Sequence, residues 1–240
     1  MASKIKVGTL ISGGGTNLQA IIDACLDHRI DAQIVFTGSD TPGVKGLERA
    51  QKANIETFVV DYSQIIQSCK KKEIADSDLP EDFNLEEMLS KQKLMDQTAS
   101  LDQLAFFLKS RAIAEKKLLD HIRSYDMDLL VLAGFMRVLT PYFIDRINTV
   151  PGKYKIMNIH PALLPAFPGT DGYGDTFAYG CKIGGCTVHY VDYGEDTGPI
   201  IGQKAFEIND TDTLEDVRKK GLEKEWQLYP ECIQKFARSF

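Results

Sequence analysis

The sequence lacks any apolar run that approaches the roughly eighteen residues of a membrane-spanning helix. It also lacks an excess of basic residues, because 28 Lys and Arg are set against 34 Asp and Glu, giving a net charge of −6. Nucleic-acid binding depends largely on basic side chains that neutralise phosphates, and no Lys/Arg-rich stripe is present. We therefore expect neither a membrane span nor a nucleic-acid partner.

Cysteine is also scarce. The five cysteines, an odd number at scattered positions, do not make a disulfide framework. Cys181 and Cys186 are the closest pair, but their spacing and the lack of further ligands nearby argue against zinc. Residues 1–6 lead straight into an expected strand, without the hydrophobic region of a signal peptide. These features predict a cytoplasmic protein that holds no metal.

With 240 residues, 43% hydrophobic and 26% charged, the chain has room for one α/β domain or two small ones. Much of it alternates short apolar strands with amphipathic helices. The expected strands are Ile5–Ile11, Gln33–Thr37, Glu56–Val60, Asp128–Ala133 and Lys155–Ile159. The expected helices are Leu18–Leu26, Gly43–Ala53, Ala112–Tyr125 and Pro141–Ile147. Such alternation predicts an α/β fold with a Rossmann-like, doubly wound and mostly parallel sheet.

The C-terminal part follows a different pattern. Gly185–Tyr193 and Ile200–Ile208 are strand candidates separated by a short glycine-rich segment, so we expect an antiparallel extension of the sheet. Thr211–Phe240 is expected to be mostly helical, starting at an Asp/Thr-rich cap and interrupted near Pro230. Residues 1–240 are expected to form a single domain.

Asn158 and His160 stand at the end of an expected strand, and Asp196 lies in a glycine-bounded loop. Residues two apart on a strand project to the same face, so the amide and the imidazole are neighbours. An amide, an imidazole and a carboxylate can polarise a carbonyl and move a proton without a metal. The alternative is structural: the residue before a proline is driven to extended geometry, and Asp-Thr-Gly-Pro is also a turn sequence.

Four segments taken together resemble the glycinamide ribonucleotide (GAR) formyltransferase family, folate-dependent enzymes of purine synthesis. In the family's order, the segments are Ile11-Ser-Gly-Gly-Gly-Thr-Asn-Leu18, Leu132-Ala-Gly-Phe-Met-Arg-Val-Leu139, Asn158-Ile-His-Pro-Ala-Leu-Leu-Pro165 and Asp196-Thr-Gly-Pro-Ile-Ile201. The resemblance covers nearly the whole chain. It implies transfer of a formyl group from the co-substrate 10-formyltetrahydrofolate to the amine of GAR.

The exception is residues 62–109, which look like an insertion of roughly forty residues, far longer than ordinary loops. The stretch is charged and Gln-rich but also contains apolar side chains such as Leu101 and Phe107. We expect a helical insertion with a helix from about Leu85 to Leu108. It either covers the mouth of the active site, forms a contact between subunits, or is a solvated elaboration without a chemical role.

By resemblance, Gly15, Thr16 and Asn17 hold the phosphate of the ribonucleotide, where backbone N–H groups at a helix N-terminus favour an anion. Taken alone, this turn is neither GxGxxG nor a Walker P-loop, and Thr16 or Asn17 acting as a helix cap is the plain alternative. Glu225 matches the family's acid that contacts the ribose and the glycine amine. A glutamate on a helix surface is the alternative there.

The resemblance also implies a folate site. Its residues are Arg111, Met136, Arg137, Val138, Leu139 and Asp192. The backbone at Arg137 and Leu139 would meet the pterin, and the loop Val191–Asp196 would close its far side. From the residues alone, Leu139 could equally belong to the core and Arg111 to the surface.

The mechanism implied is direct acyl transfer, with Asn158 as a donor to the formyl oxygen and a cationic His160 stabilising the oxyanion. Asp196 would raise the pKa of the imidazole and help carry the proton. His189, inside an apolar strand, is expected to be a hydrogen-bonded supporting residue. The implied partners are GAR and folate, in a monomer or a homodimer.

The chain departs from the family pattern at Thr170–Phe177, where members generally carry a His-containing segment. Gly172 and Gly174 predict a flexible rim there. Because this segment borders the amine acceptor, alternatives stay open. They are a formyltransferase of the same fold acting on another small phosphorylated amine, a formyltetrahydrofolate hydrolase, and a non-catalytic folate or nucleotide binder.

Overall fold

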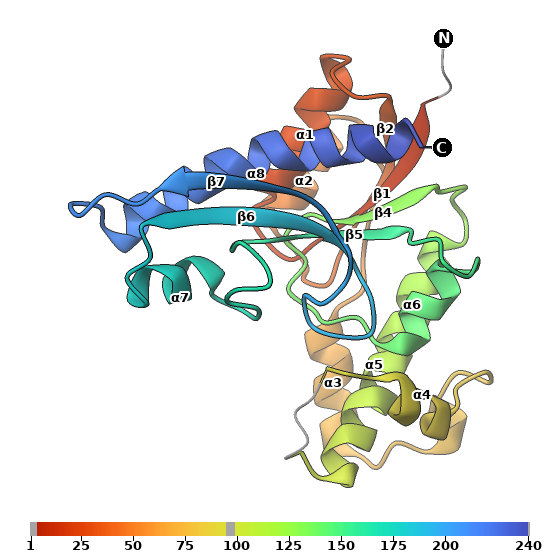
Figure 1. Cartoon of the computed structure of the whole chain (residues 1–240). Helices are drawn as coiled ribbons and strands as arrows, with labels where there is room; N and C mark the ends of the chain where they lie inside the picture. The colour runs from red at the N-terminus through yellow and green to blue at the C-terminus, as the bar shows by residue number, and fades with distance from the viewer. Residues whose placement is uncertain (1–3, 95–98, 240) are drawn as a thin grey trace.

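The computed structural model describes residues 4–94 and 99–239, with one seven-stranded sheet at its centre (Figure 1). The strands are β1 (Ile5–Ile11), β2 (Ala32–Ser39), β3 (Thr57–Val59), β4 (Leu129–Leu132), β5 (Ile156–His160), β6 (Ile183–Tyr190) and β7 (Ile200–Glu207). Their order is β3-β2-β1-β4-β5-β6-β7. The first five are parallel, and β6 and β7 are antiparallel. The expected mostly parallel sheet with an antiparallel C-terminal extension is confirmed.

Helices cover both faces of this sheet (Figure 1). The helices that share one apolar core with it are α1 (Thr16–Leu26), α2 (Lys45–Lys52) and α8 (Leu214–Ala237). Those that share the other are α3 (Tyr62–Lys71), α4 (Leu85–Lys91), α5 (Leu101–Ile122) and α6 (Pro141–Ile147). The short α7 (Gly172–Ala178) precedes β6, and a single 3₁₀ turn spans Asp76–Asp78. No helix of the described residues has the length and hydrophobicity to cross a membrane.

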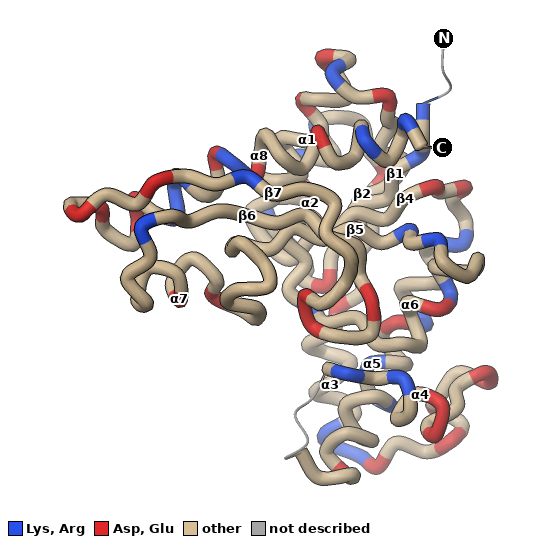
Figure 2. The backbone as a smooth tube through the Cα atoms, viewed as in Figure 1, with Lys and Arg blue, Asp and Glu red and all other residues tan. Residues whose placement is uncertain are grey.

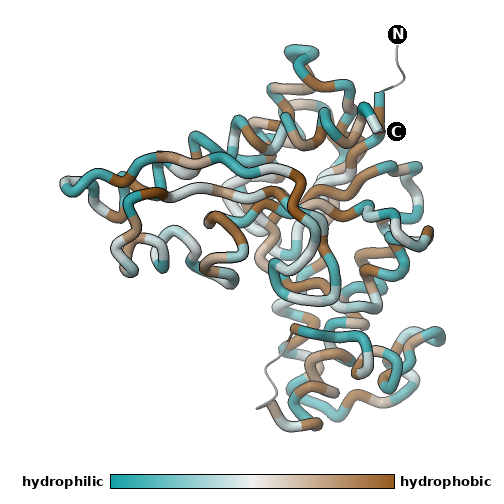
Figure 3. The backbone as a smooth tube through the Cα atoms, in the orientation of Figure 1, coloured by the Kyte–Doolittle hydropathy of each residue, from teal (hydrophilic) through white to brown (hydrophobic). Residues whose placement is uncertain are grey.

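The central strand β4 is an unbroken run of apolar residues because both of its faces are covered. Leu129 and Val131 pack into the core beneath α1 and α8, whereas Leu130 and Leu132 pack into the core on the opposite face. All four side chains are buried, and each buried aliphatic side chain stabilises the fold by about 1.5–3 kcal/mol. The hydrophobic colouring of the central strands in Figure 3 follows from this double burial.

The final helix differs from the sequence prediction. The expected interruption near Pro230 is wrong, because α8 continues through it as far as Ala237. A proline in a helix interior loses a backbone hydrogen bond, at a cost of about 3 kcal/mol. Here that cost is offset by burial of the residues around it: Tyr229 is 0% exposed, and its hydroxyl donates to the carbonyls of Leu132 and Met157 at 3.0 Å each.

The segment predicted to be an insertion, residues 62–109, also differs in detail from the expectation. The expected helix Leu85–Leu108 is instead two helices, since α4 ends at Lys91 and α5 begins at Leu101; its residues 95–98 lie outside the described part. A capping box starts α5: the Ser100 side chain accepts from the Gln103 N–H, and the Gln103 side chain accepts from the Ser100 N–H. From there α5 runs on without a break into the helix that was expected to begin at Ala112.

The predicted insertion contacts the loop between β6 and β7. The Lys93 N–H donates to the Tyr193 carbonyl at 2.9 Å. Lys91 Nζ lies 2.8 Å from Asp145 of α6, and the Tyr193 hydroxyl donates to the same carboxylate. In Figure 2 the basic end of α4 lies next to the acidic residues of this loop. The predicted insertion therefore lies beside a segment that lines the cavity described below.

Candidate active site

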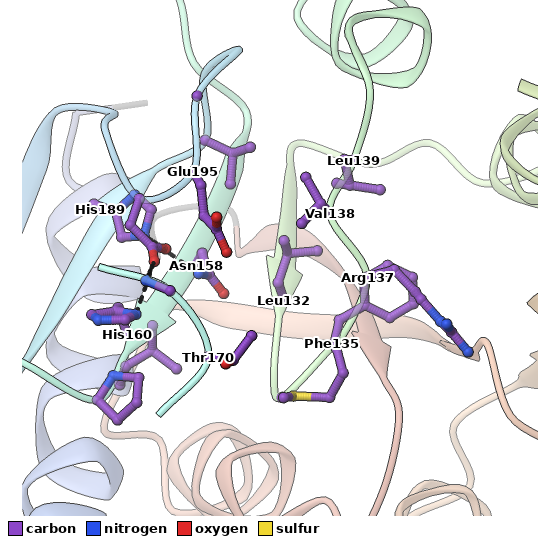
Figure 4. A pocket seen from close by; sticks show the side chains of 18 of the residues that line it. Leu132, Phe135, Arg137, Val138, Leu139, Asn158, His160, Thr170, His189 and Glu195 are labelled. Carbon is purple, nitrogen blue, oxygen red and sulfur yellow. Dashed lines mark hydrogen bonds and ion pairs between the residues drawn. The ribbon is translucent and has the colours of Figure 1, made fainter. Parts of the chain in front are cut away.

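A cavity of about 280 Å³ opens at the carboxyl ends of β4 and β5, next to the start of α1. The residues after β1 and β4 contribute to its lining, and the chain order of the sheet reverses between these two strands, the place where open α/β sheets bind ligands. The residues expected from the sequence that line it are Asn17, Met136, Arg137, Val138, Leu139, Asn158, His160, Asp192, Asp196 and Glu225. In Figure 4, Asn158, His160 and His189 converge on one side of the cavity, opposite Val138 and Leu139. One wall is therefore polar and the other apolar.

The polar wall is organised by Asp196. One of its carboxylate oxygens lies 3.1 Å from His160 Nδ1 and also accepts from the Gly169 N–H at 3.0 Å. The second nitrogen of His160 lies 2.7 Å from the Phe167 carbonyl. Asp196 and Phe167 both have positive φ, 55° and 53°. Such strained backbone in non-glycine residues concentrates at functional sites, and here it sets the two acceptors that hold one imidazole.

Electrostatics favour an ion pair in this cluster. Burial acts to lower the pKa of His160, but the adjacent Asp196 carboxylate and the Phe167 carbonyl outweigh it and raise the pKa. Burial acts to raise the pKa of Asp196, but hydrogen bonds from His160, His189 and the Gly169 N–H hold it well below the usual range. A ring with an acceptor at each nitrogen is held as the imidazolium.

His189, which the sequence predicted to be a hydrogen-bonded supporting residue, also lines the cavity. Its Nε2 lies 3.4 Å from Asp196 and 3.3 Å from Asn158 Nδ2, and its Nδ1 lies 2.8 Å from the Tyr190 carbonyl. The antiparallel register explains the proximity, because Asn158 on β5 stands opposite His189 on β6. The alternation of apolar and polar residues along one strand does not show which residue of the neighbouring strand lies opposite, because the register between strands is set by tertiary structure.

A second carboxylate, Glu225 of α8, also lines the cavity and is only 5% exposed. Its Oε2 accepts from Asn17 Nδ2 at 2.6 Å and its Oε1 accepts from the Tyr173 hydroxyl at 2.7 Å. Burial raises the pKa of Glu225, although both hydrogen bonds and the charge of His160 oppose the shift. The alternative of a surface glutamate is therefore wrong, and Tyr173 is a contact that the sequence did not indicate.

The glycine-rich turn lies beside this part of the cavity. Gly15 has φ 69° and precedes α1 with no side-chain cap, so neither Thr16 nor Asn17 acts as the cap. A Cβ at Gly15 would lie 2.6 Å from the Gly46 Cα, which restricts the position to glycine. Asn17 lines the cavity, whereas Gly15 and Thr16 do not. Their assignment to a phosphate therefore remains a prediction, based on the uncapped N–H groups at the start of α1.

Of the six residues expected to contact folate, all but Arg111 line the cavity. Met136, Val138 and Leu139 line the cavity, and Met136 is 70% exposed although apolar. The Arg137 side chain extends away from the polar cluster (Figure 4) and forms an ion pair with the buried Asp40.

Arg111 does not line the cavity. Its guanidinium lies over the rings of Tyr62 and Phe107, at 5.8 and 5.3 Å. Its Nε and Nη1 have no hydrogen-bond partner among the described residues. Desolvation by burial lowers the pKa of this arginine. Among residues 4–94 and 99–239, no group of three His, Cys, Asp or Glu side chains is placed to hold a metal ion.

Comparison with known proteins agrees with this architecture. A formyl transferase family model matches residues 5–233. The chain is 31% identical to phosphoribosylglycinamide formyltransferase of Bacillus subtilis (strain 168), over 95% of this chain and 93% of that one. The Haemophilus influenzae protein of the same name is 33% identical, over 96% and 86%. Glycinamide ribonucleotide transformylase 1 from Symbiobacterium toebii has a similar structure, with TM-score 0.72, 33% identity and coverage of 100% and 90%. The chain belongs to the formyl transferase family.

Proposed function

We propose that this protein transfers the formyl group of 10-formyltetrahydrofolate to the amine of glycinamide ribonucleotide. The arrangement of Asn158, His160 and Asp196 on one wall of the cavity carries the proposal. The names of the relatives, phosphoribosylglycinamide formyltransferases, supply the acceptor. We extend the proposal to a single cytoplasmic formyltransferase domain over residues 1–240, acting as a monomer or a homodimer.

The folate lies along the apolar wall in this proposal. Met136, Val138 and Leu139 provide a slot for a flat heterocycle, and the loop that contains Asp192 closes it. The uncapped start of α1, at Gly15, Thr16 and Asn17, takes the phosphate of the ribonucleotide. Arg111, which the family resemblance assigns to the folate, lies outside the cavity lining, so its part in binding rests on that resemblance alone.

The reaction begins with attack of the substrate amine on the formyl carbon, which forms a tetrahedral oxyanion. Asn158 donates one amide N–H to this oxygen, and the positive charge of His160 stabilises it. The C–N bond to the folate then breaks, so the amine loses a proton and the folate nitrogen gains one. Asp196 keeps His160 protonated, and its carboxylate helps to carry that proton from the amine to the folate nitrogen through water.

The test is the absorbance change on deformylation of 10-formyltetrahydrofolate, measured with and without GAR. We expect turnover only when GAR is present. Turnover without any amine would show a hydrolase instead, and folate binding without turnover on GAR would redirect the acceptor to another phosphorylated amine. Either of these results would contradict the proposal.

A further inference from the structure

Tyr173 lies in the segment where the chain departs from the family pattern, and its hydroxyl contacts Glu225. The side chain is 6% exposed, and the ring packs against Phe206 with centroids 6.1 Å apart. Its hydroxyl donates to Glu225 Oε1 at 2.7 Å, while Asn17 donates to Oε2 at 2.6 Å. Each carboxylate oxygen therefore has a neutral donor, and together the two donors fix the orientation of the carboxylate.

Two glycines make room for this arrangement. Gly221 lies one helical turn before Glu225, and a Cβ there would be 2.1 Å from the Tyr173 Cζ. Glycine in a helix interior is unfavourable, so its presence in α8 is explained by the phenol ring that occupies the space. A Cβ at Gly172 would lie 2.7 Å from the Pro161 carbonyl, so α7 packs directly on the backbone that follows β5. The segment expected to be a flexible rim is thus a close-packed helix.

The wall that results presents hydrogen-bond acceptors. Glu225 lines the cavity with its carboxylate, and Asn17 Oδ1 is buried without a hydrogen-bond partner among the described residues. A buried acceptor that lacks a partner costs free energy until a donor arrives. Amines and sugar hydroxyls are donors of the kind that these side-chain acceptors would complement, whereas the phosphate is assigned to the uncapped backbone N–H groups at the start of α1.

We propose that Tyr173 is a positioning residue that holds the Glu225 carboxylate in place for the hydrogen-bond donors of the amine-bearing substrate. The inference rests on the proposed function, since it places the acceptor substrate against Glu225. It explains how a chain that lacks the His-containing segment of the family still orders this side of the cavity.

The test is Tyr173→Phe, which keeps the ring and removes only the hydroxyl. We expect KM for GAR to rise about tenfold, with kcat within about twofold and KM for the folate unchanged. The reason is that the variant loses the hydrogen bond from Tyr173 to Glu225, and only GAR is placed against Glu225. Gly221→Ala, which displaces the ring without changing it, should raise the same KM and provides a second route if Tyr173→Phe fails to fold. Tyr125→Phe is the matched control, because Tyr125 donates to Glu56 at 2.6 Å outside the cavity.

A titration separates positioning from mere packing. The titratable groups that interact with Glu225 are His160 of β5, Tyr173 of α7, Cys186 of β6 and Tyr229 of its own helix. Removing the phenol donor from the carboxylate should raise the pKa of Glu225 further, seen by carbon-13 NMR of the free protein and as a shift of the acid limb of kcat/KM to higher pH. In a Glu225→Gln background, Tyr173→Phe should add no further change in KM.

An unchanged KM for GAR together with an unchanged Glu225 titration in Tyr173→Phe would overturn the inference and leave the proposed function standing. Absence of GAR-dependent turnover in the unmodified protein would instead overturn the proposed function. In that case the NMR titration still decides whether Tyr173 controls the carboxylate.

Discussion

Two largely buried carboxylates line the same cavity, and their partners oppose the effect of burial to different extents. Asp196 lies beside two imidazoles, His160 and His189, and its pKa is held well below the usual range. Within the described part of the chain, Glu225 accepts hydrogen bonds from an amide and a phenol alone, and burial raises its pKa. Burial disfavours the charge on both, so the partners decide which carboxylate stays ionised. A cationic partner suits a group that stabilises developing charge, and neutral donors suit one that accepts hydrogen bonds from a ligand.

The largest expected effect comes from removing the charge of the first carboxylate. We expect Asp196→Asn to lower kcat by about 10³-fold while the protein still folds, because the proton path and the support of the imidazolium are both lost. The assay is steady-state deformylation, with a thermal melt as the check on folding. Near-normal kcat would rule out the assigned role of Asp196.

The same variant has a pH signature. The raised pKa of His160 means that the charged ring is present at low pH and is lost as pH rises through that value, so kcat should fall on the alkaline side. Without the carboxylate, burial becomes the dominant influence and the pKa of His160 should drop. The alkaline limb of the Asp196→Asn profile should therefore move to lower pH. A limb that stays in place would mean that another group controls it.

The second carboxylate should affect binding more than turnover. We expect Glu225→Gln to raise KM for GAR by about 10–100-fold with a smaller change in kcat, because a charged acceptor for substrate donors is lost. Glu115→Gln is the matched control, since Glu115 is a fully buried carboxyl on Thr140 whose pKa is raised to about 7 by burial, and it lies outside the cavity lining. If kcat fell as steeply as in Asp196→Asn, the division of labour between the two carboxylates would be wrong.

His189 tests whether Asp196 depends on both of its imidazoles. Replacing it with Gln removes one partner of the carboxylate and disturbs Asn158, while His160 keeps its own contact. We expect kcat to fall about tenfold, less than for Asp196→Asn, because the remaining imidazole still supports the charge. His121→Gln, on a surface helix where the ring stacks on Phe58, is the control and should leave kcat unchanged.

The smallest expected effect comes from a residue that contacts neither Asp196 nor Glu225. Lys91 of the insertion pairs with Asp145, which also accepts from Tyr193 in the loop before Asp196. We expect Lys91→Met to raise KM for the folate about threefold with little change in KM for GAR, because a partly exposed ion pair far from the reacting groups contributes little. Lys116→Met, which removes an i,i+4 pair with Asp120, is the control. A large loss of kcat would assign the insertion a direct part in placing Asp196.

Much of the fold was predictable because its signals are local. The strand Ile5–Ile11 and the helix Pro141–Ile147 were predicted with their observed bounds. The failures came where long-range packing outweighs local propensity. Pro230 stays inside α8 because the buried Tyr229 next to it is anchored to two strand carbonyls, and no local pattern contains that contact. The helix predicted to end at Leu108 instead continues to Ile122, because Leu108 and Leu118 pack in one core.

The candidate site was predictable to a lesser degree. Asn158 and His160 share one strand face, which follows from the two-residue period of a strand. The approach of His189 depends on strand register, and that of Tyr173 to Glu225 depends on the packing of α7 against α8. Arg111 matched a motif but lies outside the cavity lining, because its guanidinium packs over two aromatic rings.

The sequence by itself determined the alternation of strands and helices, the family to which the chain belongs, and the residue types available for acyl transfer. These depend on periodicity and on short segments, which are properties of neighbours in the chain. The tertiary structure alone decided the environment of each carboxylate. Asp196 and Glu225 are similar acids in the sequence, and their pKa values shift in opposite directions because folding buries one among imidazoles and the other among neutral donors.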